Sequence, residues 1–469
     1  MNFCSLEFLI IFLPIAVFGY FWLNKKKFLN LATAWLIVVS SAFYAFYKIE
    51  NLPLIIVSLI INYAVGTTLC IDNKLKANKK TLYIVTIVLN VLFLAYFKIL
   101  NPIFAPMLDS GITYSTIVMP LAYSFITFRQ IIFLTDCYKE KITNTDFLSY
   151  ALYITFFPTI VAGPLTTYNQ IIPQFKRLRN KILNQKNLTI GLFLIGAGLF
   201  KKVVVADYLS PFATQVFDIV NQPAILETWF AMFAYTFQFY FDFSGYVDIA
   251  AGIAYLFNVT LPKNFDAPLR AISVRDFWHK WNITLSNFVK DYVYIPMGGS
   301  HINTLITYRN LVLTFLISGI MHGVNLTFIV WGFVQGAAMC IHRYWKNSCN
   351  TMQMTLAWLI TFLFTSFSFL IFRCSDLSRL GELLKSLFGF NGYAPMEIKG
   401  LSLQFENGNL SVNILLILLA VGLTFFAKST DELAKTIRPT KVYLAAIFVL
   451  YLIALINLNQ TAEFIYFKF

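Results

Sequence analysis

Long apolar runs constrain this sequence more than any other feature. A helix needs about 20 apolar residues to cross a bilayer, and runs near that length recur along the whole chain. Of the 469 residues, 58% are hydrophobic and 12% are charged, which leaves little for a water-soluble domain. Because lipid offers no hydrogen-bond partners, we predict an all-α polytopic membrane protein in which residues 1–469 form a single integral membrane domain. The runs lie near residues 4–23, 28–47, 52–70, 81–98, 117–135, 147–163, 188–206, 224–243, 245–261, 308–323, 325–342, 355–373, 412–427 and 442–457.

Short basic loops between the runs predict how the chain crosses the membrane. Basic residues collect in cytoplasmic loops, and the net charge of +14 arises in such loops, as at Lys25–Lys27. Followed along the chain, these loops put both termini outside. The run 147–163 would enter and leave on one side, and its Pro158 and Pro164 prevent a regular helix throughout. We interpret it as a re-entrant segment near a substrate path; the alternative is a span kinked by proline.

The six cysteines are scattered without the spacing of metal ligands. We therefore expect neither a metal site nor a disulfide framework. The first apolar run has no preceding positive charge and no cleavage site of small residues, so we interpret it as an anchor and not as a cleavable signal.

Residues 275–332 combine ionisable groups with apolar runs. His322 lies within such a run, and an ionisable side chain at membrane depth marks a functional site by default. Gly319 and Gly323 flank it and permit close approach, and Asn282 upstream is a polar partner for it. The alternative is a histidine that is satisfied by a neighbouring helix and has no chemical role.

Several short motifs occur in order in the middle of the chain. They are Tyr240-Phe241-Asp242-Phe243-Ser244-Gly245-Tyr246-Val247-Asp248, Phe277-Trp278-His279-Lys280-Trp281-Asn282, Leu285-Ser286, Asp291-Tyr292, Tyr308-Arg309-Asn310-Leu311 and Met321-His322-Gly323. With these motifs the chain resembles the membrane-bound O-acyltransferase (MBOAT) family over a motif core at residues 118–343, in the bacterial branch of alginate, peptidoglycan and teichoic-acid acylation. It departs from that branch at Asn282, where the branch has His, and at Met321, where the branch has Trp. His322 is therefore the only histidine that matches the motifs.

The resemblance implies a ring of roughly 11–14 helices, with re-entrant segments, around a central tunnel. It also implies that His322 is the general base for the attacking hydroxyl, a task that suits an imidazole with a pKa of about 6.5. Asn282 would hold the thioester carbonyl or orient the imidazole. His279 precedes Asn282 by three residues, so the two are expected to share a helix face, and His279 is the alternative second group.

Two carboxylates, Asp242 and Asp248, stand in an otherwise apolar run. On one helix they would point to different faces, and Gly245 between them predicts a break between two helices. Because buried acids are mostly paired, we expect them to pair with backbone groups or with an arginine, for which Arg275 and Arg309 are the candidates. The residues expected to shape the core or the tunnel are His279, Asp242, Tyr246, Asp248, Ser286, Asp291 and Arg309.

Three cations, Arg275, Lys280 and Lys290, flank the central motifs. They are expected to bind the phosphates of an acyl donor at the cytoplasmic mouth of the site. The alternative is that they only set the topology. His301 and His342 lie in or beside loops and are expected to be solvated.

The motifs favour an enzyme of the bacterial inner membrane. It is expected to move an acetyl group from cytoplasmic acetyl-CoA toward an envelope polysaccharide, with peptidoglycan preferred to alginate or another exopolysaccharide. Two alternatives stay open. Asn282 favours a lysophospholipid acyltransferase, because many eukaryotic family members carry Asn there. A lipid or glycan transporter would be expected to have paired intramembrane charges and repeated halves, which the sequence lacks.

The chain ends in a short tail, residues 458–469, which the charge pattern places outside the membrane. Its end, Phe464-Ile465-Tyr466-Phe467-Lys468-Phe469, resembles a C-terminal motif of envelope-acylating systems in which the tyrosine carries the acyl group. The resemblance implies that Tyr466 takes the acetyl group as an aryl ester and passes it to a periplasmic esterase-like protein of the SGNH type. The alternative is an aromatic anchor at the membrane interface.

Overall fold

The computed structural model describes residues 2–71, 76–100, 122–348, 352–390, 410–458 and 464–465. Within these ranges the chain is built from helices and contains no β-strand. Seven helical segments among them are long and apolar enough to cross a membrane. The prediction of an all-α polytopic membrane protein is therefore confirmed. Most of the predicted tail, including Tyr466, lies outside the described residues.

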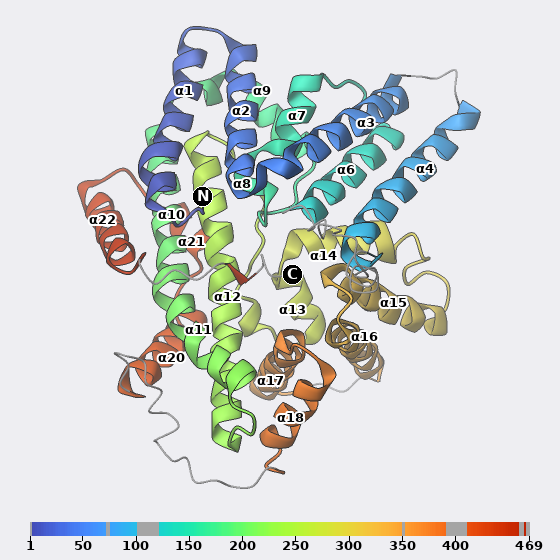
Figure 1. Cartoon of the computed structure of the whole chain (residues 1–469), viewed down its shortest axis with the longest axis vertical. Coiled ribbons are helices and arrows are strands. Elements are labelled where there is room, and N and C mark those ends of the chain that lie inside the picture. The colour runs from blue at the N-terminus through green and yellow to red at the C-terminus, as the bar shows by residue number, and fades with distance from the viewer. Residues whose placement is uncertain are drawn as a thin grey trace, which may run out of the picture. The chain divides into compact units, whose positions relative to one another are not determined.

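The described residues form two compact units, whose helices are labelled in Figure 1. Unit 1 comprises residues 1–198, 246–262 and 436–450, and unit 2 comprises residues 199–245, 263–435 and 451–469. The helices that begin in unit 1 are η1 (Glu7–Phe12), α1 (Leu13–Lys25), α2 (Leu29–Lys48), η2 (Ile49–Asn51), α3 (Leu52–Ile71), α4 (Lys76–Ala95), η3 (Tyr96–Leu100), α6 (Tyr123–Tyr138), α7 (Phe147–Thr155), α8 (Phe157–Ile160), α9 (Tyr168–Lys176), η5 (Leu178–Lys181), α10 (Gln185–Leu199) and α22 (Lys441–Ile456). Those that begin in unit 2 are η6 (Phe200–Ala206), α11 (Asp207–Thr214), η7 (Gln215–Ile219), α12 (Ile225–Leu256), η8 (Pro268–Arg270), α13 (Val274–Lys280), α14 (Ile283–Val289), η9 (Lys290–Tyr294), α15 (Thr304–His322), α16 (Leu326–Asn347), α17 (Met354–Arg373), α18 (Leu377–Leu387), α20 (Leu410–Phe425) and α21 (Thr430–Thr436).

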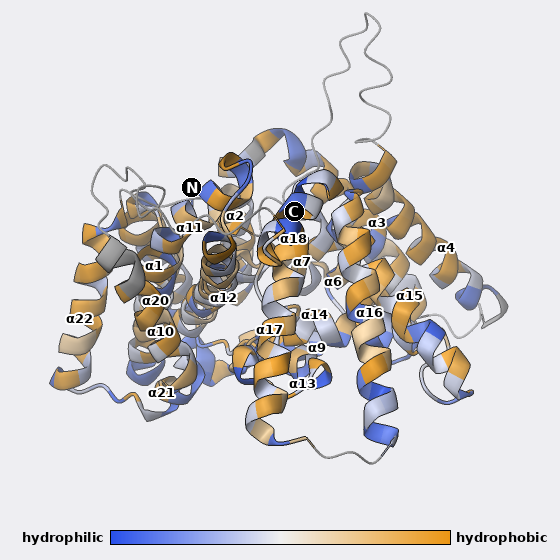
Figure 2. Cartoon of the chain, turned by 90° about the horizontal axis from the view of Figure 1, so that it is seen from below, coloured by the Kyte–Doolittle hydropathy of each residue, from blue (hydrophilic) through white to orange (hydrophobic). Residues whose placement is uncertain are grey.

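The first helices of unit 1 expose apolar side chains along their length. Phe18 is 71% exposed and Leu89 is 60% exposed, and Figure 2 shows hydrophobic residues along most of α3 and α4. Exposed apolar patches of this extent are unfavourable in water. These faces therefore meet lipid, as the sequence predicts for membrane spans.

The run 147–163 is interrupted, as its prolines predict. Helix α7 ends at Thr155, Phe156 leaves the helical conformation with φ −48° and ψ 107°, and the short α8 follows. Nine residues of α7 give roughly 13 Å of helix, well short of a membrane crossing. The fully buried Arg129 of α6 satisfies backbone groups at the break, because its guanidinium donates to the carbonyl oxygens of Ile154, at 3.1 Å, and Thr159. No local sequence pattern predicts this role for Arg129.

Helix α12 is one continuous helix of 32 residues. The predicted break at Gly245 is therefore wrong. A glycine inside a helix costs only about 1 kcal/mol, and the side chains around it are buried on both sides of the position. The boundary between the two units falls between Gly245 and Tyr246 without interrupting the helix.

In unit 2, α15 and α16 form an antiparallel hairpin with very close backbones. A Cβ atom added at Gly319 would lie 2.3 Å from the carbonyl oxygen of Phe328, and one at Gly332 would lie 2.4 Å from that of Phe315. Small residues permit this approach between membrane helices. The predicted close approach at Gly319 is thus made by a helix, and it fixes the end of α15, where His322 lies.

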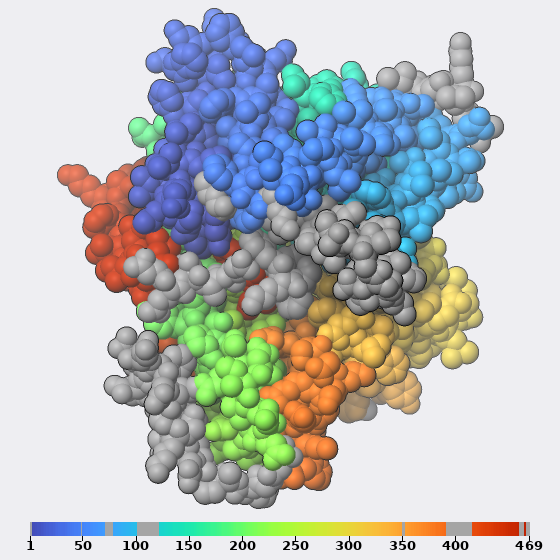
Figure 3. All heavy atoms as spheres, in the orientation of Figure 1, coloured from blue at the N-terminus to red at the C-terminus, as the bar shows by residue number. Residues whose placement is uncertain are grey.

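Helices α17 and α18 complete this part of unit 2. Figure 3 shows them (orange) beside the first half of α12 (green). The rings of Phe233 in α12 and Phe362 in α17 stack with centroids 5.8 Å apart, and Trp229 Nε1 donates to the carbonyl oxygen of Leu387 at 3.1 Å. This packing holds α17 as one wall of the site described next.

Candidate active site

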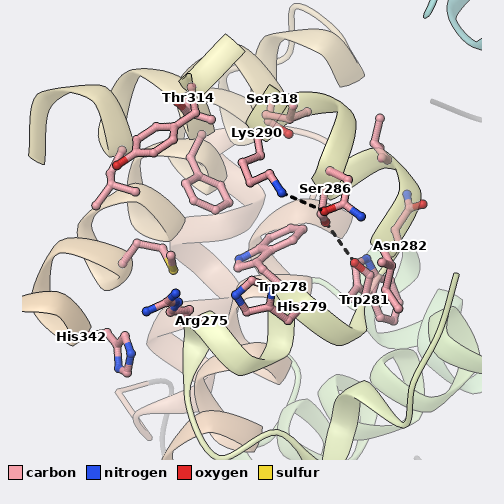
Figure 4. A pocket seen from close by; sticks show the side chains of 18 of the residues that line it. Arg275, Trp278, His279, Trp281, Asn282, Ser286, Lys290, Thr314, Ser318 and His342 are labelled. Carbon is pink, nitrogen blue, oxygen red and sulfur yellow. Dashed lines mark hydrogen bonds between the residues drawn. The ribbon is translucent and has the colours of Figure 1, made fainter. Parts of the chain in front are cut away.

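Unit 2 contains a cavity of about 500 Å³, a size that suits a small-molecule ligand. Side chains from α12, α13, α14, α15, α16 and α17 form its walls, and most of its surface is apolar. Figure 4 shows Arg275 and His342 on one side of the cavity and Trp281, Asn282 and Ser286 on the other.

One face of α15 forms a wall of the cavity. Its lining residues are Leu311, Thr314, Phe315, Ser318 and His322. These positions follow one another by three, one, three and four residues, which places them on a single stripe of an α-helix. The stripe runs for roughly 16 Å at 1.5 Å per residue and ends at the imidazole. The predicted catalytic histidine therefore lies in the cavity, at one end of it.

His322 is half-buried and surrounded by aromatic rings. Its ring centroid lies 5.1 Å from that of Phe372, 5.8 Å from that of Trp331 and 6.1 Å from that of Phe328. The helix ends directly after it at Gly323, whose φ of 151° favours glycine. The imidazole thus stands at a helix terminus with apolar walls that restrict water.

Asn282 also lines the cavity, from the turn between α13 and α14. It is buried and adopts the left-handed conformation, with φ 41° and ψ 53°, which Asn tolerates better than most residues. Its Oδ1 accepts from Asn264 Nδ2 at 3.1 Å, and Asn264 Oδ1 in turn accepts from the backbone and the hydroxyl of Thr284. A ligand carbonyl can only accept a hydrogen bond, so the Nδ2 hydrogens of Asn282 are the atoms of this side chain that can bind it. Asn264 carried no motif that would have predicted this role.

His279 lines the cavity as well, but it does not share a helix face with Asn282. Helix α13 ends at Lys280, Trp281 is extended and Asn282 is left-handed, so the predicted i, i+3 relation is wrong. Trp278 Nε1 donates to Gln335 Oε1 at 3.1 Å and fixes α13 against α16.

A cluster of basic residues lines the other end of the cavity. It consists of Arg275 at the start of α13 and of His342, Arg343 and Lys346 in the last turns of α16. Arg275 lies close enough to His342 for their charges to interact, and Figure 4 shows the two together. Arg275 and Lys346 are exposed, so this end is the mouth of the cavity. We name these four residues the mouth cluster.

The mouth cluster differs from the predicted set of cations. Lys290 lines the cavity, but Lys280 pairs with Asp276 at 2.9 Å and is not among the described lining residues. His342 is half-buried in the cavity wall, so the expectation that it is solvated is wrong; His301 is exposed as expected. Met339 also lines the cavity, and it shares one helix face with the three members of the cluster that lie on α16. Helical spacing along α16 could therefore have predicted these three residues.

The acidic residues lie elsewhere. Asp242 pairs with Lys202 at 2.6 Å and not with either predicted arginine; Arg309 donates to Asn310 Oδ1 at 3.1 Å. Lys202 precedes Asp242 by 40 residues, which no local pattern predicts. Tyr246 and Asp248 are buried in unit 1.

The remaining predicted residues have separate roles. The Ser286 hydroxyl lines the cavity and donates to the carbonyl oxygen of Trp281 at 3.1 Å. Asp291 is exposed and pairs with Lys290 at 3.5 Å. Tyr466 lies outside the described residues. Among the residues that the structure describes, no three His, Cys, Asp or Glu side chains gather as metal ligands.

Comparison of the sequence with known proteins identifies its family. The family model for "MBOAT, membrane-bound O-acyltransferase family" matches residues 41–378. The chain belongs to the MBOAT family. It is 37% identical to the peptidoglycan O-acetyltransferase of Helicobacter pylori over 85% of this chain and 82% of that protein. It is 31% identical to the probable alginate O-acetylase AlgI of Pseudomonas aeruginosa, over 91% and 82%, and 27% identical to the teichoic acid D-alanyltransferase of Bacillus subtilis, over 54% and 68%.

Family membership identifies the chain as an enzyme, a multi-pass membrane O-acyltransferase. It also gives the cavity a chemical context. His322, Asn282 and the mouth cluster share this mostly apolar cavity, which has room for a small-molecule ligand.

Proposed function

We propose that the enzyme transfers an acetyl group from cytoplasmic acetyl-CoA across the bacterial inner membrane for O-acetylation of peptidoglycan. The observation that carries this proposal is the arrangement of one cavity, with the mouth cluster at one end and His322 at the other. Acetyl-CoA has the matching form, because a long thin arm joins its phosphates to its thioester.

The mouth cluster suits the phosphates of the donor. Arginine binds phosphate with paired, charge-assisted hydrogen bonds, and Arg343 has a buried Nε–H that lacks a hydrogen-bond partner among the described residues. Along α16, Lys346 is fifteen residues from Trp331, the neighbour of His322, which corresponds to roughly 22 Å. Phosphates held at the mouth would leave the thioester arm to extend along this wall toward the imidazole.

The inner end of the cavity suits acyl transfer. His322 removes the proton of the attacking hydroxyl while the hydroxyl oxygen bonds to the thioester carbon. Asn282 Nδ2 donates to the carbonyl oxygen, on which negative charge develops. The C–S bond then breaks, and the imidazolium returns its proton to the leaving thiolate. The rings of Trp331 and Phe372 limit water, which favours transfer over hydrolysis.

The acceptor hydroxyl in this scheme is the phenol of Tyr466 in the C-terminal tail. A large polymer outside the membrane and a cytoplasmic donor cannot meet in one narrow cavity, so a carrier is required. An aryl ester suits this role, because a phenol with a pKa of about 10 is a good leaving group. A periplasmic esterase-like partner of the SGNH type then moves the acetyl group to the sugar.

The preference for peptidoglycan rests on similarity. The relative that is 37% identical is named for peptidoglycan, and the one that is 31% identical is named for alginate. Alginate or another exopolysaccharide is therefore the alternative acceptor.

The test is mass analysis of muropeptides from cells with the gene, without it, and without it but carrying the Tyr466→Phe variant. We expect O-acetylated muropeptides only in cells with the wild-type gene. Tyr466→Phe keeps the aromatic ring and removes the hydroxyl, so it distinguishes a carrier from an anchor. Unchanged muropeptide acetylation in the deletion strain would exclude peptidoglycan, and assay of exopolysaccharide acetate in the same strains would then test the alternative.

A further inference from the structure

A buried cluster of three charged residues lies in unit 2, apart from the cavity lining. Lys202 Nζ lies 2.7 Å from Asp207 Oδ1 and 2.6 Å from Asp242 Oδ1. The side chains are 1–3% exposed. A buried ion pair adds little net stability compared with apolar side chains in the same place. Fold stability alone therefore does not explain why three charged residues are buried here.

The C-terminal tail makes direct contact with this cluster. The backbone N–H of Ile465 donates to Asp242 Oδ2 at 3.0 Å, and the ring of Phe464 lies over Lys202 Nζ at 4.8 Å from its centroid. Both tail residues are buried, Phe464 at 1% exposure. One oxygen of Asp242 thus binds the lysine and the other binds the tail.

These contacts are of the strong kinds. A hydrogen bond from a backbone N–H to a buried carboxylate is charge-assisted, and a desolvated ammonium over an aromatic ring is a favourable cation–π pair. A short terminal segment would otherwise be expected to fray. The cluster therefore holds Phe464 and Ile465 in place.

We infer that Lys202, Asp207 and Asp242 form a docking site for the chain's own C-terminal tail. Asp242 sits on α12 between Phe239 and Phe243, which both line the cavity, so Ile465 is bound within one helical turn of the cavity wall. The residue that follows Ile465 in the sequence is Tyr466. Docking makes Asp242 a positioning residue for the acyl carrier, and in this respect the inference rests on the proposed function.

Hydrogen exchange of the full-length protein, followed by mass spectrometry, tests docking without reference to acyl transfer. In the wild type we expect the amides of the C-terminal peptide to be protected. Asp242→Asn removes the charge that accepts from Ile465 and should raise their exchange by roughly 10- to 100-fold, while peptides from α15 and α16 stay unchanged. Equally fast exchange of the tail in the wild type and in this variant would overturn the inference.

A second pair of variants leaves the buried cluster intact. Ile465→Pro removes the donating N–H, whereas Ile465→Ala keeps it and only trims the side chain. Normalised for intrinsic rates, we expect the neighbouring tail amides to lose protection in the proline variant and to keep most of it in the alanine variant. Equal protection in the two variants would contradict docking through this hydrogen bond, whatever the fate of Asp242→Asn.

Comparison with acetylation separates the inference from the proposed function. Tyr466→Phe retains the Ile465 N–H, so its tail should stay protected although polymer acetylation is lost. Ile465→Pro should lose protection and reduce acetylation together, and Ile465→Ala should retain both. If Tyr466→Phe still supports acetylation, the carrier role fails while docking stands; if Ile465→Pro acetylates normally with an unprotected tail, the positioning role of Asp242 is refuted.

Discussion

The close contact between α15 and α16 predicts that a single methyl group will reduce catalysis more than stability. Gly332→Ala would place a Cβ atom 2.4 Å from the carbonyl oxygen of Phe315. Heavy atoms pack best at about 3.5 Å, so the two backbones would have to separate by about 1 Å. Overpacking of this kind costs about 1–3 kcal/mol, and the better helix propensity of Ala returns about 1 kcal/mol. The net loss in the free energy of unfolding is therefore about 0–2 kcal/mol.

The effect on activity should be larger, because α15 carries His322 and α16 carries His342, Arg343 and Lys346 of the mouth cluster. A displacement of about 1 Å can reduce an enzyme's rate by about 100-fold. The assay is acetyl transfer from radiolabelled acetyl-CoA by the purified protein in nanodiscs, with thermal unfolding measured on the same samples.

Gly422→Ala in α20 is the matched control. Among the described residues, nothing outside the local helix backbone lies within 4 Å of a Cβ added there, so this variant should keep its activity and gain stability of up to about 1 kcal/mol from helix propensity. Gly332→Ala with the activity of Gly422→Ala would refute the claim that the spacing of the hairpin positions the site.

Three further predictions concern single side chains. Asn282→Gly removes the amide without straining the left-handed backbone and should lower the transfer rate by about 10²–10³-fold; if Asn282→Gly is active and Asn282→Ala is not, only the backbone conformation matters. Arg343→Gln should raise the KM for acetyl-CoA by about tenfold with little change in kcat, whereas Lys280→Gln, outside the described cavity lining, should leave both unchanged; equal effects of the two would contradict the mouth cluster. Burial opposes ionisation of Asp146, but hydrogen bonds from Ser149 hold its pKa below the ordinary value, so the carboxylate stabilises the fold above about pH 4 and less as the pH falls. Asp146 is the N-cap of α7, where its side chain accepts from the backbone N–H of Ser149. Asp146→Ala should therefore cost about 0.5–2 kcal/mol in the free energy of unfolding at neutral pH, and a cost that does not shrink in acid would contradict a stabilising role of the ionised N-cap.

The sequence predicts well which residues line the His322 end of the cavity, because local patterns determine them. His322 is prominent as an ionisable group in an apolar run, and the α15 stripe that leads to it follows helical periodicity. Pro158 in the interrupted run likewise fixes a backbone irregularity from local chemistry alone.

Long-range pairings were not predictable in the same way. The partner of Asp242 is Lys202, 40 residues earlier, and its second partner is the backbone of Ile465, 223 residues later. Buried polar groups find partners through the fold, and spacing along the chain does not encode which ones. The predicted helix break at Gly245 was wrong for a related reason. Burial of the side chains around Gly245 stabilises the helix by more than the low helix propensity of one glycine costs.

The central claim is that His322 is the general base of acyl transfer. The most direct measurement is the single-turnover rate of acetyl transfer from acetyl-CoA by the His322→Ala variant, purified and reconstituted beside the wild type. We predict a rate about 10²–10⁴-fold lower, with the same thermal unfolding temperature and the same affinity for acetyl-CoA, because the mouth cluster lies at the other end of the cavity. A stable, donor-binding His322→Ala protein that transfers acetyl at close to the wild-type rate would contradict the account.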